Sequence, residues 1–303
     1  MIDYDGRSWL PILFRMRGSV IPRLVPRIVV ATGLGVIAVL LLETRNFKIP
    51  SVAHALVGVA LGLLLVFRTN ASYDRYWEGR KLLGFIVNRT RDLARQTGAY
   101  VVNPEARAAL ARFVPAFYWL AAQTLRRDPS LGEAERLLTE PQRKALEGVT
   151  FRAPVVAAWI SERLREEVAA GRLSEQRLQL FDANLTALND ALGGAERILR
   201  TPIPFAYAQH IKIFVVLFCF SAPFVMADVM GWATPAAVAF LALALFGIDE
   251  IGVEIEDPFG DDPNDLPLGA IGDGIERAVG EIVQTSAFAV PVASASGSAS
   301  ASA

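Results

Sequence analysis

Four apolar runs, grouped as two close pairs, constrain the fold of this chain more than any other feature. Each run holds 15 to 17 residues; they are residues 28–42, 52–67, 213–227 and 232–248. A helix that crosses the hydrocarbon core of a bilayer needs about 20 residues, so each run is short by itself. Flanking Arg27, Lys212 and Trp232 can reach the headgroups and lengthen the spans. We therefore predict four membrane-spanning helices that also pack against protein; buried helices of a soluble protein are the weaker alternative.

The composition is typical of a chain that is only partly embedded in a membrane. Hydrophobic residues make up 53% of the 303 residues, yet 20% are charged. The 30 basic and 31 acidic residues nearly cancel, which gives no sign of nucleic-acid binding. With one cysteine, Cys219, an intramolecular disulfide is excluded, and the two separated histidines do not support a metal site. No catalytic triad or phosphate-binding loop is found, so we expect no enzymatic activity.

The polar block between the two pairs, residues 68–211, carries 21 of the 30 basic residues. Its apolar residues recur at helical spacing and no alternating strand pattern is found, so we predict an all-α protein. Helices are expected over residues 104–127, 139–146, 153–170, 174–199 and 266–283. Arginines before the first run and after the second run place the N-terminus, the block and the C-terminus in the cytoplasm.

These patterns divide the chain into six segments. The first, residues 1–27, is amphipathic and basic and is expected to form an interfacial helix. The others are a transmembrane hairpin (28–67), a cytosolic helical region (68–211), a second hairpin (212–248), an acidic loop with a C-terminal cytosolic helix (249–285) and a low-complexity tail (286–303). The tail cannot bury a core, and we expect it to be disordered.

The second apolar run changes within two residues into a charged, aromatic-rich segment. No proline lies between Val52 and Lys81, so one helix can continue through the change. One face of the run carries three bulky apolar residues at i, i+4 and i+8, namely Val59, Leu63 and Phe67. On the adjoining face, Gly58 and Gly62 have the GxxxG spacing that permits close helix packing. Several copies around an axis would turn the apolar column into a hydrophobic gate, although a lipid-facing or core stripe explains the spacing more simply.

Acidic residues gather after the fourth run on a loop rich in proline and glycine. The oxygen-bearing side chains of this loop are those of Asp257, Asp261, Asp262, Asn264 and Asp265. Such ligands suit Ca²⁺, but their spacing is not that of an EF-hand. Helix capping and ion pairs with the arginines explain the acids equally well.

Three stretches, in this order, resemble the bestrophin family. They are FRTNASYDRYWEGRK (67–81), RTPIPFAYAQH (200–210) and IEDPFGDDPNDLPL (255–268). The resemblance covers about residues 5–285. It implies a homopentameric ion channel with four spans per subunit, a cytosolic helical region and one axial pore. It also implies that the second run lines this pore and that Val59, Leu63 and Phe67 form its neck.

The resemblance also bears on the ions. Animal members conduct chloride and carry a Ca²⁺ clasp, whose side-chain positions match Asp262 and Asp265. Here Pro263 and Asn264 interrupt the acidic run, which argues against Ca²⁺ activation, and no cofactor is required. The compact chain resembles the bacterial branch, whose members favour monovalent cations. We therefore expect a passive channel for monovalent ions in the bacterial cytoplasmic membrane, with cations favoured over chloride. The family's second, cytosolic constriction is best matched by Leu178.

Two other functions stay open at this point. A non-conducting membrane scaffold or regulatory partner could use the arginine-rich block to recruit another protein. A transporter is the third hypothesis, but the sequence shows no inverted repeat and no interrupted helix in the middle of a span.

Overall fold

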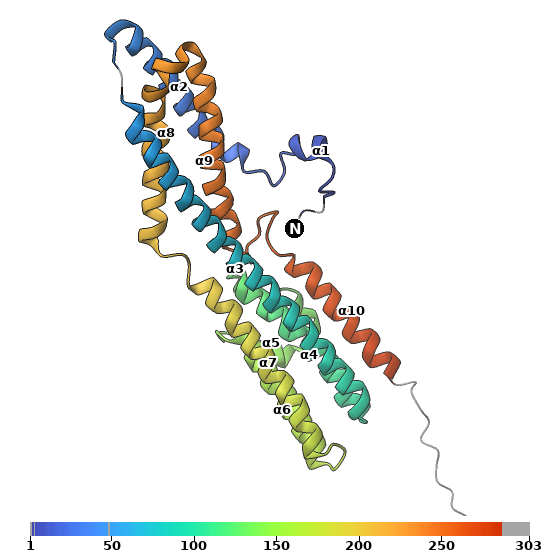
Figure 1. Ribbon diagram of the computed structural model, residues 1–303. Coiled ribbons are helices and arrows are strands. Elements are labelled where there is room, and N and C mark those ends of the chain that lie inside the picture. Colours follow the sequence, from blue (N-terminus) through green and yellow to red (C-terminus); the bar gives the residue numbers. More distant parts are fainter. Residues whose placement is uncertain (1, 3, 48, 287–303) are drawn as a thin grey trace, which may run out of the picture. The chain divides into compact units, whose positions relative to one another are not determined.

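The structure is a computed structural model that describes residues 2, 4–47 and 49–286 (Figure 1). Within these residues it is entirely helical, as predicted, and contains no strand. The predicted tail lies outside the described residues from position 287 onward. The described residues form two compact units: those up to residue 82 together with 194–267, and residues 83–193 together with 268–286. The boundaries after residues 82 and 193 fall inside two long helices, so each of these helices contributes to both units.

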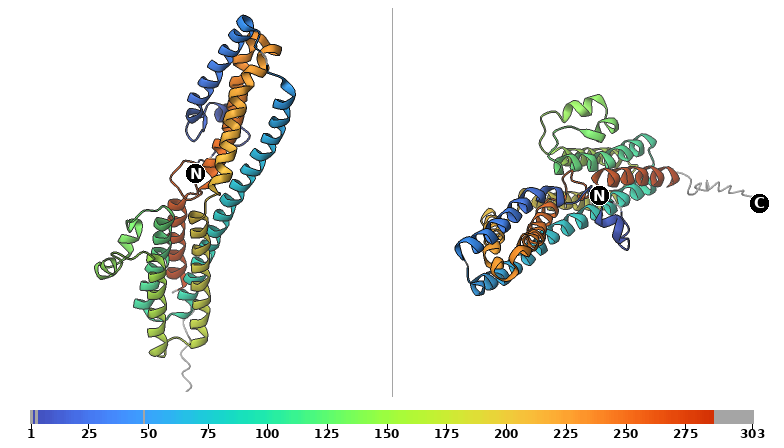
Figure 2. Two further views of the ribbon diagram at one scale, coloured as in Figure 1. Left: turned by 90° about the vertical axis from the view of Figure 1, so that its left-hand side faces the viewer. Right: turned by 90° about the horizontal axis from the view of Figure 1, so that it is seen from above.

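The first unit is a bundle of four long helices. They are α2 (Ile21–Arg45), the first part of α3 (Ser51–Tyr100), α8 (Phe205–Met230) and α9 (Thr234–Glu256). Helices α2, α8 and α9 pack against one another, as two further views show (Figure 2). Apolar residues from all four helices form the core, among them Leu24, Leu61, Val215 and Phe246.

Three helical stretches are long and apolar enough to span a membrane. They are Ile21–Arg45, Ser51–Tyr100 and Phe205–Glu256. The third contains both α8 and α9, joined by the short 3-10 helix η2 (Gly231–Ala233). Gly231 has a φ of +51°, which glycine adopts without the steric penalty of a side chain. The chain can therefore reverse at this glycine.

The N-terminal segment does not form the single interfacial helix that was expected. The short helix α1 (Trp9–Leu13) ends early, and Gly18 has a φ of +77°, which breaks a right-handed helix. Helix α2 then begins at Ile21 with Pro22 in its first turn, a position where proline is well tolerated. Glycine and proline together therefore separate the basic segment from the first span.

The acidic segment that was expected to be a loop from residue 249 begins as a helix. Helix α9 continues to Glu256, and the chain becomes extended only at Asp257. A residue that precedes a proline avoids the helical conformation, and Pro258 follows Asp257. The break is therefore set by this proline, and Asp249, Glu250 and Glu254 lie on a helix.

The second unit is built around α4 (Pro104–Leu125), which is buried along most of its length. It also contains α3 from Leu83, η1 (Gly132–Leu137), α5 (Glu140–Ala145), α6 (Arg152–Ala169), α7 (Glu175–Arg200) as far as Gly193, and α10 (Leu268–Ser286). Helices α6 and α10 pack against α4. The buried Tyr118 hydroxyl donates to the Leu268 carbonyl at 2.8 Å. Helices are present at all five predicted positions outside the apolar runs, whereas η1 was not predicted.

Candidate functional site

One side of the first part of α3 presents large apolar side chains away from the bundle. The side chains predicted to form a neck, Val59, Leu63 and Phe67, are 76%, 56% and 55% exposed. Val52 and Leu56, which precede them on the helix, are exposed as well. Contiguous apolar surface of this kind marks a contact with lipid or with another protein. The structure therefore brings the three residues together on a surface that the single chain leaves open.

The opposite side of α3 is packed inside the bundle. Leu61 and Leu65 are buried in its core. At Gly58, a Cβ atom would lie 2.9 Å from the ring of Phe218 on α8, so this glycine permits a close approach. At Gly62, by contrast, no atom of another described part of the chain lies within 4 Å of the corresponding position. The two glycines share a sequence pattern but differ in their surroundings.

An arginine lies on the buried side of α3 directly after the apolar run. Arg68 is 2% exposed, and its Nη2 donates to the carboxylate of Glu256 on α9 at 2.9 Å. Its Nε lies 3.9 Å from Oδ1 of Asp249, whose Oδ2 accepts a hydrogen bond from Lys212 of α8 at 3.0 Å. A buried charge is stable only when it is paired. These ion pairs therefore join α3, α8 and α9 at one end of the bundle.

Arg75, two turns further along α3, binds main-chain carbonyls. Its guanidinium donates to Ile198 at 2.7 Å, to Thr201, and to Glu256 at 3.2 Å. The carbonyls in the last turn of a helix lack partners within that helix, and here the arginine supplies donors to the end of α7. The carboxylate of Glu256 in turn accepts the N–H of Ile203 at 3.0 Å.

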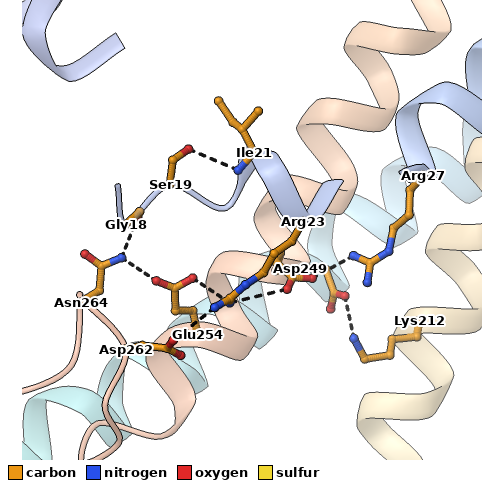
Figure 3. Close-up of polar contacts among 11 residues, drawn as sticks. Gly18, Ser19, Ile21, Arg23, Arg27, Lys212, Asp249, Glu254, Asp262 and Asn264 are labelled. Carbon is orange, nitrogen blue, oxygen red and sulfur yellow. Dashed lines mark hydrogen bonds and ion pairs between the residues drawn. The ribbon is translucent and has the colours of Figure 1, made fainter. Parts of the chain in front are cut away.

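A second group of ion pairs joins the start of α2 to α9 and the loop after it (Figure 3). Arg23 contacts Glu254 and Asp262, each at 3.2 Å. Arg27 contacts Glu250 at 2.8 Å. Both arginines are about half exposed, so water screens these pairs and each adds little stability.

The carboxylates of Asp262 and Asp265, the proposed calcium ligands, are directed to different partners. The Asp262 side chain binds Arg23, whereas nearly buried Asp265 accepts the N–H of Asp262 at 2.7 Å. Burial, followed by the nearby carboxylates, raises the pKa of Asp265 to about 6. Within the described ranges, no three acidic, histidine or cysteine side chains gather as a metal site would require. A calcium ion here would have to displace Arg23 from Asp262.

Leu178, the candidate for a second constriction, lies in the other unit. It is partly buried and belongs to the first turn of α7. The neck residues and Leu178 are therefore parts of two separately packed units.

The sequence interpretation did not single out the residues that hold α3 in the bundle. A signal was present in the spacing: Arg68 and Arg75 are seven residues apart on one helix, and Asp249 and Glu256 are seven apart on another. Residues seven apart lie on the same face of a helix, separated by two turns. The structure brings both carboxylates to Arg68, while Arg75 binds main-chain carbonyls, so the matching spacing by itself did not identify these contacts.

Known proteins resemble this chain along nearly its whole length. A family model described as "Bacterial/Fungal Bestrophin protein" matches residues 1–281. A "voltage-dependent anion channel-forming protein" of Nostoc sp. is 39% identical over 286 residues, which cover 92% of this chain and 93% of that protein. The protein of that name, YneE, from Escherichia coli K12 is 30% identical, covering 91% and 92%.

A solved structure gives the same result for the fold. The crystal structure of a bacterial bestrophin homologue from Klebsiella pneumoniae superposes with a TM-score of 0.82 at 29% identity. The match covers 86% of this chain and 98% of that one. On this evidence, the chain belongs to the bacterial and fungal bestrophin family.

Proposed function

We propose that this protein is the subunit of a passive ion channel in the bacterial cytoplasmic membrane, with a pore that forms between copies of α3. The proposal rests on one observation: Val59, Leu63 and Phe67 form an exposed apolar column on a helix that is long and apolar enough to span a membrane. Its relatives are named channel-forming proteins, which supports the same function.

The pore is proposed to lie on the axis of a homopentamer to which α2, α3, α8 and α9 of each subunit contribute four spans. A single chain leaves the column uncovered, so rings of apolar side chains arise only when several copies meet. Such rings form a constriction that passes ions when it is wetted and blocks them when it is dry. The bundle end that carries Arg23, Arg27 and Lys212 would face the cytoplasm, together with both termini.

The sign of the permeant monovalent ion is a separate part of the proposal, because an apolar neck carries no charge of its own. The names of the relatives favour anions. The resemblance of the sequence to the bacterial branch of the bestrophin family favoured cations. A reversal potential measured in planar bilayers under a NaCl gradient separates the two, because it shifts toward the Cl⁻ or the Na⁺ equilibrium potential.

The decisive experiment is the triple variant Val59→Ala, Leu63→Ala, Phe67→Ala, reconstituted in liposomes. Smaller side chains widen and wet the neck, so ion flux should rise several-fold. The matched control removes three exposed apolar side chains of α2 with Val29→Ala, Val30→Ala and Leu40→Ala, and should leave the flux unchanged. Equal flux in the two assembled variants would contradict the neck assignment. No flux from the assembled native protein would favour a non-conducting scaffold.

A further inference from the structure

Glu256, the last residue of α9, contacts two successive levels of α3. Its carboxylate accepts a hydrogen bond from Arg68 at 2.9 Å, and its main-chain carbonyl accepts one from Arg75 at 3.2 Å. The two arginines are two turns apart on the same face of α3. One residue of α9 therefore holds α3 at two points along its axis.

The same residue also holds the link between α7 and α8. This link has the sequence Thr201-Pro202-Ile203-Pro204, and neither proline has an N–H group. The Ile203 N–H, the one donor between the prolines, is accepted by the other carboxylate oxygen of Glu256 at 3.0 Å. Arg75 binds the Thr201 carbonyl of the same link. The α7–α8 link and α3 are thus fastened to each other through Glu256 and Arg75.

These contacts fix the rotation of α3 about its own axis. Successive residues of a helix are about 100° apart, so Arg68 directly follows Phe67 but points about a quarter turn away from it. The helix contains no proline and continues without interruption from Ser51 to Tyr100. A rotation at Arg68 would therefore turn Leu63 and Phe67 by a similar angle.

We infer that Glu256 is a positioning residue for the neck: by binding Arg68, Arg75 and the α7–α8 link, it sets the direction in which Leu63 and Phe67 project. This inference rests on the proposed function. Arg68 depends strongly on this one partner, because its Nε and Nη1 atoms are buried without a hydrogen-bond partner. Loss of the Glu256 charge leaves a buried cation with only the more distant Asp249 nearby.

Disulfide cross-linking between copies reports the direction of the neck residues. The background carries Leu63→Cys together with Cys219→Ser, which removes the chain's single native cysteine. Copper phenanthroline should then link the copies in membranes. Adding Glu256→Gln keeps the size and the acceptor for Ile203 but removes the charge, and should slow cross-linking at least about threefold. Combining it with Arg68→Gln removes the unpaired cation but does not restore the link between α3 and α9, so cross-linking should stay slower than in the background.

Two further variants separate positioning from general damage. Glu78→Gln removes one carboxylate from an exposed ion pair between α3 and Arg197, and should not change the cross-linking rate. Arg75→Lys keeps the charge but loses the planar guanidinium that reaches three carbonyl oxygens, so cross-linking should slow in this variant. It therefore tests the inference even if Glu256→Gln fails to assemble. Native rates in both Glu256→Gln and Arg75→Lys would overturn this inference alone. If the background variant formed no cross-link, Leu63 would not lie near a shared axis, and both proposals would be contradicted.

Discussion

The two halves of α3 differ in how many of their large apolar residues are left exposed. In residues 51–82, large apolar side chains such as Val59 and Leu63 are exposed, while Arg68 is buried. In residues 83–100 the usual arrangement returns: Ile86 and Leu93 are buried. In this half the exposed positions include arginines. One continuous helix therefore changes from a segment that is apolar on both its buried side, with Leu61 and Leu65, and its exposed side to an ordinary amphipathic one.

The contrast shows which parts of the molecule are complete in a single chain. The second half buries most of its large apolar residues, among them Leu83, Ile86 and Leu93, within the single chain. The first half leaves a row of apolar side chains uncovered, which is stable only against lipid or further copies. The buried arginine of this half is balanced by α9, so its inner side is held by charge pairs in addition to apolar contacts.

The largest expected effect is the difference between two leucine-to-alanine variants, one in each half of α3. Leu93→Ala removes a side chain that is 1% exposed and should lower the free energy of unfolding by about 2–5 kcal/mol. Leu63→Ala removes one that is 56% exposed and should change protomer stability by less than about 1 kcal/mol while raising flux. Thermal unfolding in detergent measures the first effect and liposome flux the second. If both variants lowered the free energy of unfolding equally, the two halves of α3 would not differ in burial as described.

Much of this architecture follows from local sequence. The apolar runs fall in α2, α3, α8 and α9, because the length and composition of such runs decide which helices can enter a membrane. Prolines and glycines such as Pro204 and Gly171 mark several of the helix ends. The shared face of the neck residues followed from a spacing of four. Each of these features depends on residues that are close together in the chain.

The partners of α3 could not be predicted in the same way. Arg68 pairs with Glu256, 188 positions away, and only the packing of α3 on α9 brings the two together. Gly58 and Gly62 are equivalent in sequence, and only the position of Phe218 on α8 distinguishes them. Contacts between distant segments therefore had to come from the structure.

The loop that contains Asp265 contacts the last turns of the first half of α3, and its contribution to stability should depend on pH. The Tyr76 hydroxyl donates to the Asn264 carbonyl at 3.2 Å, so the loop that contains Asp265 lies on α3. The pKa of Asp265 is about 6 in the folded protein and about 4 in an unfolded chain, so the folded state binds the extra proton between these values. Stability should therefore fall as the pH rises from about 4 to above 6, by at most ~3 kcal/mol.

Asp265→Asn tests this response, because the amide stays neutral and can still accept the N–H of Asp262. The variant should lose the fall in unfolding temperature between pH 4 and pH 7, and at pH 7 it should be more stable than the native protein. Asp261→Asn, an exposed change in the same loop, should keep the native pH profile. An unchanged profile in Asp265→Asn would show that this carboxylate does not determine the pH dependence.

A smaller effect is expected at the inner glycine of the first half. Gly58→Ala places a methyl group 2.9 Å from the Phe218 ring, and this ring also stacks on His54 at 4.0 Å between centroids. The ring has little freedom to move away, so the variant should lose about 1–3 kcal/mol of stability through overpacking. Thermal unfolding in detergent measures the loss. A gain in stability would show that α3 and α8 can separate without penalty.

The smallest effect, and the sharpest test of the contrast, is expected at Gly62. Alanine favours a helix over glycine by up to about 1 kcal/mol, and the added methyl meets no other described part of the chain beyond its own helix turn. Gly62→Ala should therefore stabilise the separated protomer slightly. If a second copy packs closely on this face, the same methyl must weaken assembly. Size-exclusion chromatography with light scattering, performed over a dilution series, would then show dissociation at higher concentration than in the native protein. Assembly unchanged by Gly62→Ala would place the contact between copies elsewhere on the exposed side of α3.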